Sequence, residues 1–266
     1  MVWEGRLQAT RRRNAPSSAQ PWVARLVRDA PGCLRVAAVY GSLAIAAGVA
    51  ALTTLTIVAL LIFRFVNPPM STLMAGQWLT GQTIDQRWVP LDAISPNLIR
   101  AVITSEDGQF CTHRGIDFRE LALAMKEAER TGDVRGASTI SMQVSKNLFL
   151  WPSKNLIRKG LELWFTVAME LMWPKHRILE VYLNIAEWGP GIFGAEAAAR
   201  HHFNKSALRL TPRESALLAA SLPNPIVRNA GKAGPGTRRL AQIIEARAKS
   251  AGPRSACVLA RGPAGR

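Results

Sequence analysis

Hydrophobic residues are concentrated near the N-terminus in one uncharged run that extends from Val36 to Phe63. About 20 apolar residues are enough for a helix to cross the hydrocarbon core of a bilayer, and this run is longer. The apolar core of a cleaved signal peptide is only ~7–15 residues long, so that alternative is disfavoured. The pattern therefore predicts an uncleaved transmembrane signal anchor over residues 36–63.

Arginine is distributed unevenly on the two sides of this span. Residues 1–35 contain several arginines and few acids, whereas only Arg64 and Arg87 follow the span before Arg100. Positively charged flanks stay in the cytoplasm. We therefore expect a single-pass protein of the inner membrane with a cytoplasmic basic N-terminal segment and a catalytic domain in the periplasm.

Beyond the anchor, apolar residues recur at helical spacing and no run of alternating strands is visible. Pro68 and Pro69 end the anchor, because proline cannot continue a helix. From Asp117 to Arg130, apolar side chains fall at i, i+3, i+4 and i+7, with Asp117 as the expected N-cap. The other predicted helices cover residues 96–108, 138–150, 155–173, 175–188, 194–203 and 211–223.

These patterns predict a mainly α protein with one N-terminal transmembrane helix and one helical domain over residues 95–230. Residues 64–94 are expected to be a connector. Residues 231–266 are basic and rich in Gly and Pro, which predicts a tail with at most one short helix.

Charge and cysteine content narrow the functional classes. The excess of 34 Lys and Arg over 18 Asp and Glu gives a net charge of +16, which suits nucleic acid, an anionic membrane surface or a phosphate-bearing substrate. The expected topology disfavours nucleic acid. Cys33 lies at the membrane edge, so only Cys111 and Cys257 could pair, and free thiols are the favoured state because the spacing indicates no disulfide framework or metal site.

Two groups of acids could carry chemistry. Glu106 and Asp107 are adjacent in the stretch SEDGQFCTHRG, which is either a solvated helix end or a catalytic acid tuned by its surroundings. Glu162 follows Arg158 and Lys159 by one helical turn. These three residues form either a surface ion pair, worth ~0–1 kcal/mol, or a carboxylate held in a cleft by two cations.

Basic side chains also gather between residues 138 and 159, interleaved with hydroxyl and amide side chains. The set comprises Ser138, Thr139, Gln143, Lys146, Asn147, Lys154, Arg158 and Lys159. Several donors and cations together suit a diphosphate, although a solvated basic face is the alternative. No Walker loop, HExxH or GxSxG is present. Carboxylates beside a diphosphate cradle favour glycosyl transfer from a diphosphate donor.

These stretches resemble the motifs of the peptidoglycan glycosyltransferases, glycosyltransferase family 51. EDGQFCTHRG resembles EDxxFxxHxG, GASTISMQVSKN resembles GxSTIxxQxxKN, RKGLE resembles RKxxE, and RILEVYLN resembles ILExYLN. The likeness continues to about Pro225, and the chain has neither the SxxK nor the KTG of a transpeptidase. The chain is therefore similar to the monofunctional branch of the family, the biosynthetic peptidoglycan transglycosylases.

The resemblance implies a lysozyme-like helical lobe beside a smaller membrane-proximal jaw region. It implies transfer of the growing glycan chain from undecaprenyl diphosphate to the 4-hydroxyl of lipid II, with inversion and a β-1,4 linkage. Glu106 would be the general base and Glu162 a second carboxylate at the donor diphosphate. Phe110 and His113 would shape the pocket around the base, and Asp107 would orient it.

The same resemblance assigns the substrate-binding residues and the expected partners. The binding set is Asp107, Phe110, His113, Ser138, Thr139, Gln143, Lys146, Asn147, Lys154, Arg158 and Lys159. No tightly bound cofactor or protein metal site is implied, although Mg²⁺ or Mn²⁺ is allowed at the donor diphosphate. The expected partners are lipid II, the undecaprenyl-diphosphate-linked glycan chain and the bilayer. Proteins of cell-wall synthesis or division are also allowed.

Two positions depart from the family pattern. Met142 stands where many members have Gln, and Lys154 stands where an arginine often binds diphosphate. Both changes affect the expected donor affinity and rate but not the reaction class. Two alternatives stay open: a lytic, lysozyme-like glycosidase, which the Lys/Arg cluster disfavours, and a catalytically weak cell-wall scaffold protein, which only Met142 supports.

Overall fold

The computed structural model describes residues 32–131, 138–153 and 155–259. The chain divides into two units, residues 1–55 and 56–266, each of which is described by itself. Helix α2 (Gly32–Phe65) begins in the first unit and ends in the second.

Helix α2 contains the predicted span. Its candidate membrane-spanning segment is Val36–Phe65, with a mean hydropathy of 2.4. In the first unit its large apolar side chains are exposed, including Tyr40 at 70% and Ile45 at 71%. Such a surface is unfavourable in water and suits lipid. The predicted apolar helix is confirmed, which supports single-pass anchoring, while its orientation stays a prediction.

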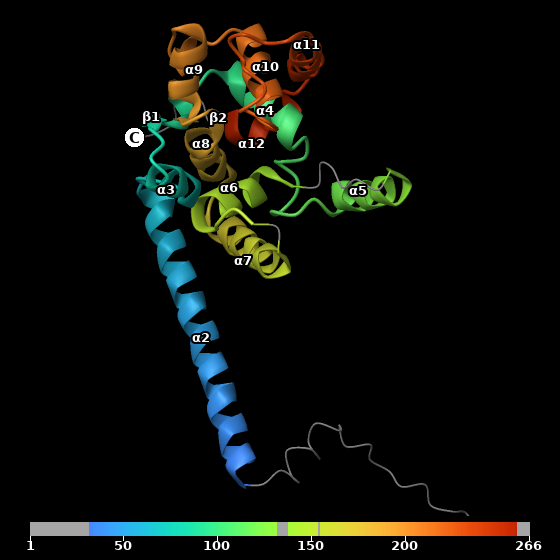
Figure 1. Ribbon diagram of the computed structural model, residues 1–266. Coiled ribbons are helices and arrows are strands. Elements are labelled where there is room, and N and C mark those ends of the chain that lie inside the picture. Colours follow the sequence, from blue (N-terminus) through green and yellow to red (C-terminus); the bar gives the residue numbers. More distant parts are fainter. Residues whose placement is uncertain (1–31, 132–137, 154, 260–266) are drawn as a thin grey trace, which may run out of the picture. The chain divides into compact units, whose positions relative to one another are not determined.

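The second unit is mainly helical (Figure 1). Its elements are α3 (Thr72–Leu79), β1 (Asp85–Gln86), η1 (Leu91–Ala93), α4 (Pro96–Glu106), α5 (Phe118–Thr131), α6 (Ile140–Phe149), α7 (Leu156–Met172), α8 (Lys175–Ile185), β2 (Glu187–Gly189), β3 (Ile192–Phe193), α9 (Ala195–Phe203), η2 (Ala207–Arg209), α10 (Pro212–Ser221), α11 (Pro235–Lys249), η3 (Pro253–Ser255) and α12 (Ala256–Leu259). The helices expected between residues 96 and 223 are all present, and the mainly α class is confirmed.

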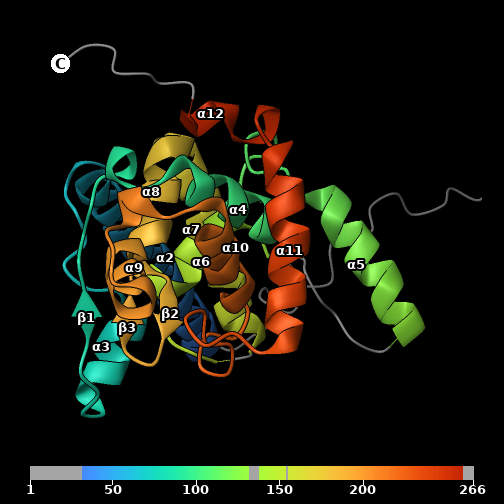
Figure 2. The same ribbon diagram turned by 90° about the horizontal axis from the view of Figure 1, so that it is seen from above.

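The core lies around α8, whose side chains from Arg177 to Ile185 are buried except for the half-buried Glu180. Helix α8 packs on α6, which also packs on α7. Helix α4 packs on α10 and α11, and the three lie side by side in Figure 2. Because burial of apolar surface is the main favourable term in folding, these contacts fix the ends of α4 and α6, where the candidate site residues lie.

Side-chain caps set where several helices begin. The Asp117 carboxylate accepts from the amides of Arg119 and Glu120 at 3.0 Å, which confirms the predicted N-cap of α5. The Thr211 hydroxyl and the Glu214 carboxylate form a reciprocal capping box at the start of α10. Such caps satisfy backbone amides that have no partner within the helix.

A small sheet joins β1, β3 and β2, with β1–β3 parallel and β2–β3 antiparallel. The hydrophobic pattern did not predict it, because strands of two or three residues are too short to display an alternation. Gly191 has φ +71°, and a Cβ there would lie 2.3 Å from the carbonyl oxygen of Thr83, so only glycine fits this turn.

The expectation for residues 231–266 was wrong in part. Helix α11 has 15 residues and packs on α4 and α10, and η3 and α12 follow it. The Gly and Pro residues are at the ends of these elements, with Pro235 in the first turn of α11 and Gly252 before η3. Between them Ala241 and Ile244 are buried, so a helical apolar face was present in a segment that composition alone assigned to a tail.

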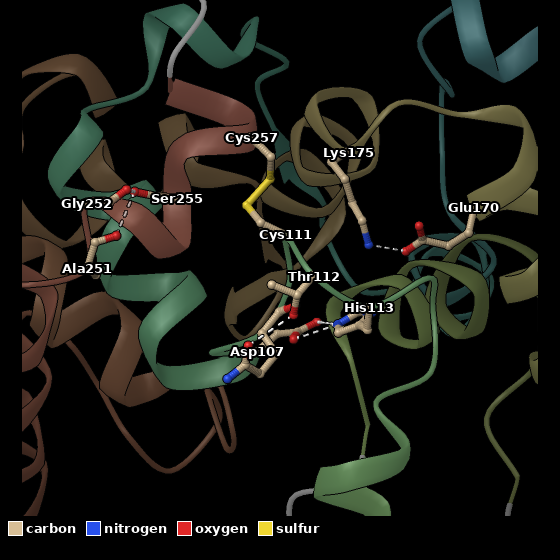
Figure 3. The surroundings of a disulfide bond; sticks show 11 residues. Asp107, Cys111, Thr112, His113, Glu170, Lys175, Ala251, Gly252, Ser255 and Cys257 are labelled. Carbon is tan, nitrogen blue, oxygen red and sulfur yellow. Dashed lines mark hydrogen bonds and ion pairs between the residues drawn. A yellow bond between two sulfur atoms is a disulfide. The ribbon is translucent and has the colours of Figure 1, made fainter.

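The preference for free thiols was also wrong, because Cys111 and Cys257 form a disulfide (Figure 3). They are separated by 146 positions in the sequence, and their Cα atoms are 5.7 Å apart. The fold brings them together because α11 packs along α4 and η3 also contacts α4, which places α12 beside the segment that follows α4. Sequence spacing carries no signal for such a pairing.

The disulfide predicts a thiol count and a stability change. Of the three cysteines, the unfolded, unreduced protein should titrate as one thiol, Cys33, and the reduced protein as three. Reduction should lower Tm, because closing a long loop is worth about 4–5 kcal/mol in the chain-entropy treatment. Ellman titration and thermal unfolding with and without a dithiol measure both. Three thiols before reduction, or an unchanged Tm, would contradict the pairing.

Candidate active site

Glu106 is the last residue of α4, at the edge of the core. Leu98, Val102 and Ile103 of the same helix are fully buried, so the end of α4 is held firmly. The amide of Asp107 donates to the carbonyl of Ile103 at 3.0 Å and closes the helix. Glu106 itself is half-buried. A carboxylate is thereby fixed at the boundary between protein and solvent.

Asp107 connects this helix end to α6. Its two carboxylate oxygens lie 2.8 and 2.9 Å from Nε2 of His113 (Figure 3). Its Oδ2 also accepts from the amide of Ile140 at 2.9 Å. Nδ1 of His113 accepts from the amide of Gly115 at 3.1 Å, so the ring proton lies on Nε2 and points to Asp107. Both side chains orient the segment, which is the role expected for Asp107.

Gly115 and Thr139 complete this connection. Gly115 has φ +93°, and a Cβ there would lie 2.9 Å from Cγ2 of Thr166, so the segment can approach α7 only with glycine at this position. The Thr139 hydroxyl donates to the carbonyl of Gly115 at 2.5 Å and accepts from the amide of Met142 at 3.2 Å. The hydroxyl predicted to bind substrate is therefore already engaged in capping α6.

The Glu106 carboxylate has a defined hydrogen-bond donor. Nε2 of Gln143 donates to Oε2 of Glu106 at 3.1 Å, and Oε1 of Gln143 accepts from the hydroxyl of Tyr182 at 3.2 Å. Burial raises the pKa of Tyr182 well above its ordinary value, and Glu106 and Asp107 add to this rise. Tyr182 therefore stays protonated and fixes the amide of Gln143 with its NH₂ group towards Glu106.

The surroundings of Glu106 make it a stronger base than an exposed glutamate. Burial raises the pKa of Glu106, and the charge of Asp107 raises it further. The hydrogen bond from Gln143 and the charges of Lys146 and Arg228 oppose the rise. A carboxylate with a raised pKa suits proton abstraction.

Glu162 is held by two cations on α7. Nη1 of Arg158 lies 2.8 Å from its Oε2, and Nζ of Lys159 lies 2.6 Å from its Oε1. The Glu162 side chain is only 3% exposed, which contradicts the surface ion pair and agrees with a carboxylate enclosed by cations. Nε of Arg158 is buried and has no hydrogen-bond partner among the residues that the structure describes, so within them this guanidinium has a free donor.

The charge of Lys146 interacts with both candidate acids, Glu106 and Glu162. Lys146 is exposed as a whole, but partial burial of its ammonium group lowers the pKa of that group. The charges of Arg158 and Lys159 lower this pKa further. Glu162 and Glu106 both oppose this. A lysine that interacts with both carboxylates can stabilise negative charge that develops near either of them.

Two cavities adjoin opposite ends of α6. One, of about 350 Å³, is lined by both site carboxylates of the α4 end, Glu106 and Asp107, together with Ser138 and Thr139. The other, of about 510 Å³, is lined by four apolar residues and four polar or cationic ones. Its lining is Leu73, Lys146, Asn147, Leu150, Trp151, Pro152, Ser153 and Arg158. In the described part of the chain, Ser153 Oγ, like Arg158 Nε, is buried without a hydrogen-bond partner.

Phe110 is buried and belongs to the support of this region. Its ring packs edge-on against His113, and Nζ of Lys175 lies 4.6 Å from the ring centroid. Lys175 also pairs with Glu170 at 2.7 Å (Figure 3). Because Phe110 is fully buried, it supports the segment around the base from inside the protein and cannot itself contact a substrate.

The structure groups the predicted residues into two sets. Glu106, Asp107, Ser138 and Thr139 share one cavity, and Lys146, Asn147 and Arg158 share the other. The remaining predicted residues either contact these sets or lie elsewhere: Phe110, His113, Gln143, Lys159 and Glu162 contact them, and Lys154 falls outside the described residues. Met142 is only 4% exposed, so its side chain packs within the protein.

Sequence reasoning missed Tyr182, Ser153 and two arginines of the C-terminal segment that line the Glu106 cavity, Arg247 and Arg254. Tyr182 lies inside the stretch RILEVYLN, but the sequence placed it only within a predicted helix and gave it no role. The arginines carried no signal, because their segment was expected to be a tail.

A divalent cation at the donor diphosphate stays a prediction. In the part of the chain that the structure describes, no three His, Cys, Asp or Glu side chains cluster as metal ligands. Both oxygens of Glu162 are occupied by Arg158 and Lys159. These residues do not fit a protein-bound metal, and the positive charge available beside Glu162 comes from side chains.

Comparisons with known proteins agree with this arrangement. The family model described as Transglycosylase matches residues 74–249. A protein of Agrobacterium fabrum is 53% identical over 191 residues, which cover 72% of this chain and 84% of the relative. One of Rhodospirillum centenum is 57% identical over 181 residues (68% and 78%), and one of Brucella suis is 48% identical over 190 residues (71% and 85%). All three are named biosynthetic peptidoglycan transglycosylase.

The contact between Gln143 and Glu106 predicts the effect of removing it. Gln143→Leu should raise the pKa of Glu106 further, because the lost hydrogen bond favours the ionised form. Tyr182→Phe should act in the same direction but less, since Gln143 keeps its amide and loses only its fixed orientation. Carbon-13 NMR titration of labelled glutamate measures both, with the signal assigned by its loss in Glu106→Gln.

The matched control is Asn147→Leu, one turn further along α6 and on the other cavity, which should leave the Glu106 titration unchanged. A pKa of Glu106 that falls or stays constant in Gln143→Leu would contradict the assigned contact.

Proposed function

The chain belongs to the transglycosylase family, and from this premise we propose that it polymerises the glycan strands of peptidoglycan. The growing chain passes from its undecaprenyl diphosphate carrier to the 4-hydroxyl of lipid II, forming a β-1,4 linkage. The observation that carries the proposal is a half-buried Glu106 of raised pKa that opens on a polar cavity, with the diphosphate-suited Lys146 in electrostatic contact with it.

The reaction needs a base at the acceptor. Glu106 takes the proton of the 4-hydroxyl, and the resulting oxygen attacks C1 of the donor sugar from the face opposite the diphosphate. The new C1–O bond forms as the bond from C1 to the diphosphate oxygen breaks, which inverts the configuration. Gln143 and Tyr182 hold the carboxylate in position throughout.

The reaction also needs positive charge at the departing diphosphate. Lys146 and Arg158 line one cavity, and the buried Nε of Arg158 is free to donate. Arginine and lysine stabilise phosphate oxygens directly, so the leaving group needs no proton. Glu162 then acts through the cations that it holds, because its oxygens are both engaged with Arg158 and Lys159.

The membrane supplies both substrates, and exposed apolar side chains of the second unit fit contact with it. Helices α5 and α7 expose large apolar residues, among them Phe118, Met125, Leu156, Ile157 and Leu171. We assign these helices to the membrane-proximal jaw, with the domain in the periplasm and residues 1–35 in the cytoplasm. Association with other proteins of cell-wall synthesis or division stays a prediction.

A lytic glycosidase is the second candidate, because a carboxyl group of raised pKa can also serve as a general acid. Such an enzyme needs a second carboxylate free to act on water or the sugar. Glu162 is bound by Arg158 and Lys159, which disfavours that role. Release of soluble fragments from isolated sacculi, without any polymerisation of lipid II, would favour the lytic enzyme.

The test of the proposed base is Glu106→Gln in detergent with labelled lipid II, with products resolved by size. The wild type should form long, lysozyme-sensitive glycan, and the variant should form none. The fold of the variant should be as stable as the wild type or more stable at neutral pH. A raised pKa means that the ionised carboxylate opposes folding above its unfolded pKa, and this difference should vanish in acid.

Glu129→Gln, an exposed glutamate of α5, is the control and should keep full activity. Near-normal polymerisation by Glu106→Gln would refute Glu106 as the base, and no polymer from folded wild-type protein would favour the scaffold alternative.

The cation at the donor is tested by Lys146→Ala. Turnover should fall by about 10²-fold, as expected for removal of one group that stabilises transition-state charge, while acceptor KM changes little. The matched control is Lys249→Ala on α11, which lines neither site cavity. Steady-state rates with donor and acceptor varied separately give both constants. A loss confined to acceptor KM would contradict the donor role of Lys146.

A further inference from the structure

The cavity beside Glu106 has a second wall that comes from the C-terminal segment. Arg247 of α11 and Arg254 of η3 line it, opposite the end of α4 and the start of α6. The family match ends at residue 249, so η3 and α12 lie beyond it. Arg247 lies inside the family match, whereas Arg254 comes from a segment outside it and still lines the cavity on which the candidate base opens.

The segment η3–α12, which carries Arg254, is held in place by a disulfide and by packing. The disulfide joins Cys257 of α12 to Cys111 in the segment that holds His113 (Figure 3). Ser255, in η3, is fully buried, and its hydroxyl donates to the carbonyls of Ala251 and Gly252. Element η3 also contacts α4. Arg254 is therefore carried by a short element held on both sides, rather than by a free chain end.

Both guanidinium groups are free to bind a ligand. Within the described residues, the side chains of Arg247 and Arg254 have no hydrogen bond or ion pair. Of the carboxylates that line the cavity, Asp107 binds His113 and Ile140, Asp117 caps α5, and Glu106 accepts from Gln143. Glu120 is exposed.

We propose that Arg247 and Arg254 form a subsite for an oxyanion carried by the acceptor. The proposal rests on the proposed function, because the acceptor hydroxyl has to reach Glu106 and so enters this cavity. The planar guanidinium group binds carboxylate or phosphate through two parallel hydrogen bonds. Lipid II carries such groups in two places, the carboxylates of its peptide and its diphosphate. The subsite aligns the acceptor so that its hydroxyl faces the base.

The test uses the full-length protein and the variants Arg247→Gln and Arg254→Gln. Each should raise acceptor KM by about tenfold, the loss expected for one charged hydrogen bond, with little change in kcat. Arg239→Gln, another exposed arginine of α11 that does not line the cavity, is the matched control and should leave KM unchanged. Equal effects of all three variants would indicate a general charge effect and overturn the subsite.

Lipid II with amidated peptide carboxylates identifies the source of the oxyanion. If the subsite binds a peptide carboxylate, the wild type should use this acceptor about tenfold less well, and the variants should show no further loss. If the subsite binds the diphosphate, amidation should leave the acceptor KM of the wild type unchanged. The variants should then show the same rise in KM with both acceptors. An unchanged acceptor KM in both variants overturns the proposal for either source.

The disulfide provides an independent perturbation of the same wall. Cys257→Ser should raise acceptor KM as the arginine variants do, because Arg254 loses its fixed position. Binding of labelled lipid II to each variant in the Glu106→Gln background requires no turnover. It therefore separates the two proposals. Weakened binding of lipid II by the variants, together with an inactive wild type, would contradict the proposed function but not the subsite. Unaltered binding of lipid II by the variants would contradict the subsite but not the proposed function.

Discussion

The carboxylate of Asp107 accepts from the ring of His113 and from the amide of Ile140, and these bonds join the end of α4 to the start of α6. The position of Glu106 relative to Gln143 depends on this junction, because the two residues lie on those two helices. The left-handed Gly115 and the cap by Thr139 keep the connecting segment close enough for the junction to form. An aliphatic side chain at position 107 would leave the Ile140 amide and the His113 ring without their acceptor.

The charged forms of two site residues, Glu106 and Lys146, are disfavoured by their surroundings. Burial raises the pKa of Glu106 and lowers the pKa of Lys146, so at neutral pH the charged form of each opposes folding. The helices that carry them are nevertheless fixed by buried apolar faces on α4, α6 and α8. The core therefore holds two titratable groups whose surroundings raise the pKa of one and lower the pKa of the other.

Much of this arrangement was predictable from local sequence, and the rest depended on long-range packing. Periodicity located the helices from α4 to α10, and the motif stretches contained Glu106, Gln143, Lys146 and Glu162. The engagement of Thr139 in a cap and the enclosure of Glu162 by two cations are geometric and need coordinates. The disulfide partners and the arginines of the C-terminal segment come from elements that meet only in the folded chain.

Helix α6 sets the distance between the two halves of the proposed chemistry. Gln143, which holds the base, and Lys146, which faces the donor cavity, are three residues apart and therefore on neighbouring turns of one face. Their axial separation is about 4.5 Å, from the helical rise of 1.5 Å per residue. Val144, between them, and Leu148, just beyond, are buried and anchor the helix in the core. Because one helix carries both Gln143 and Lys146, loop motion cannot change the spacing between the group that holds the base and the cation at the leaving group.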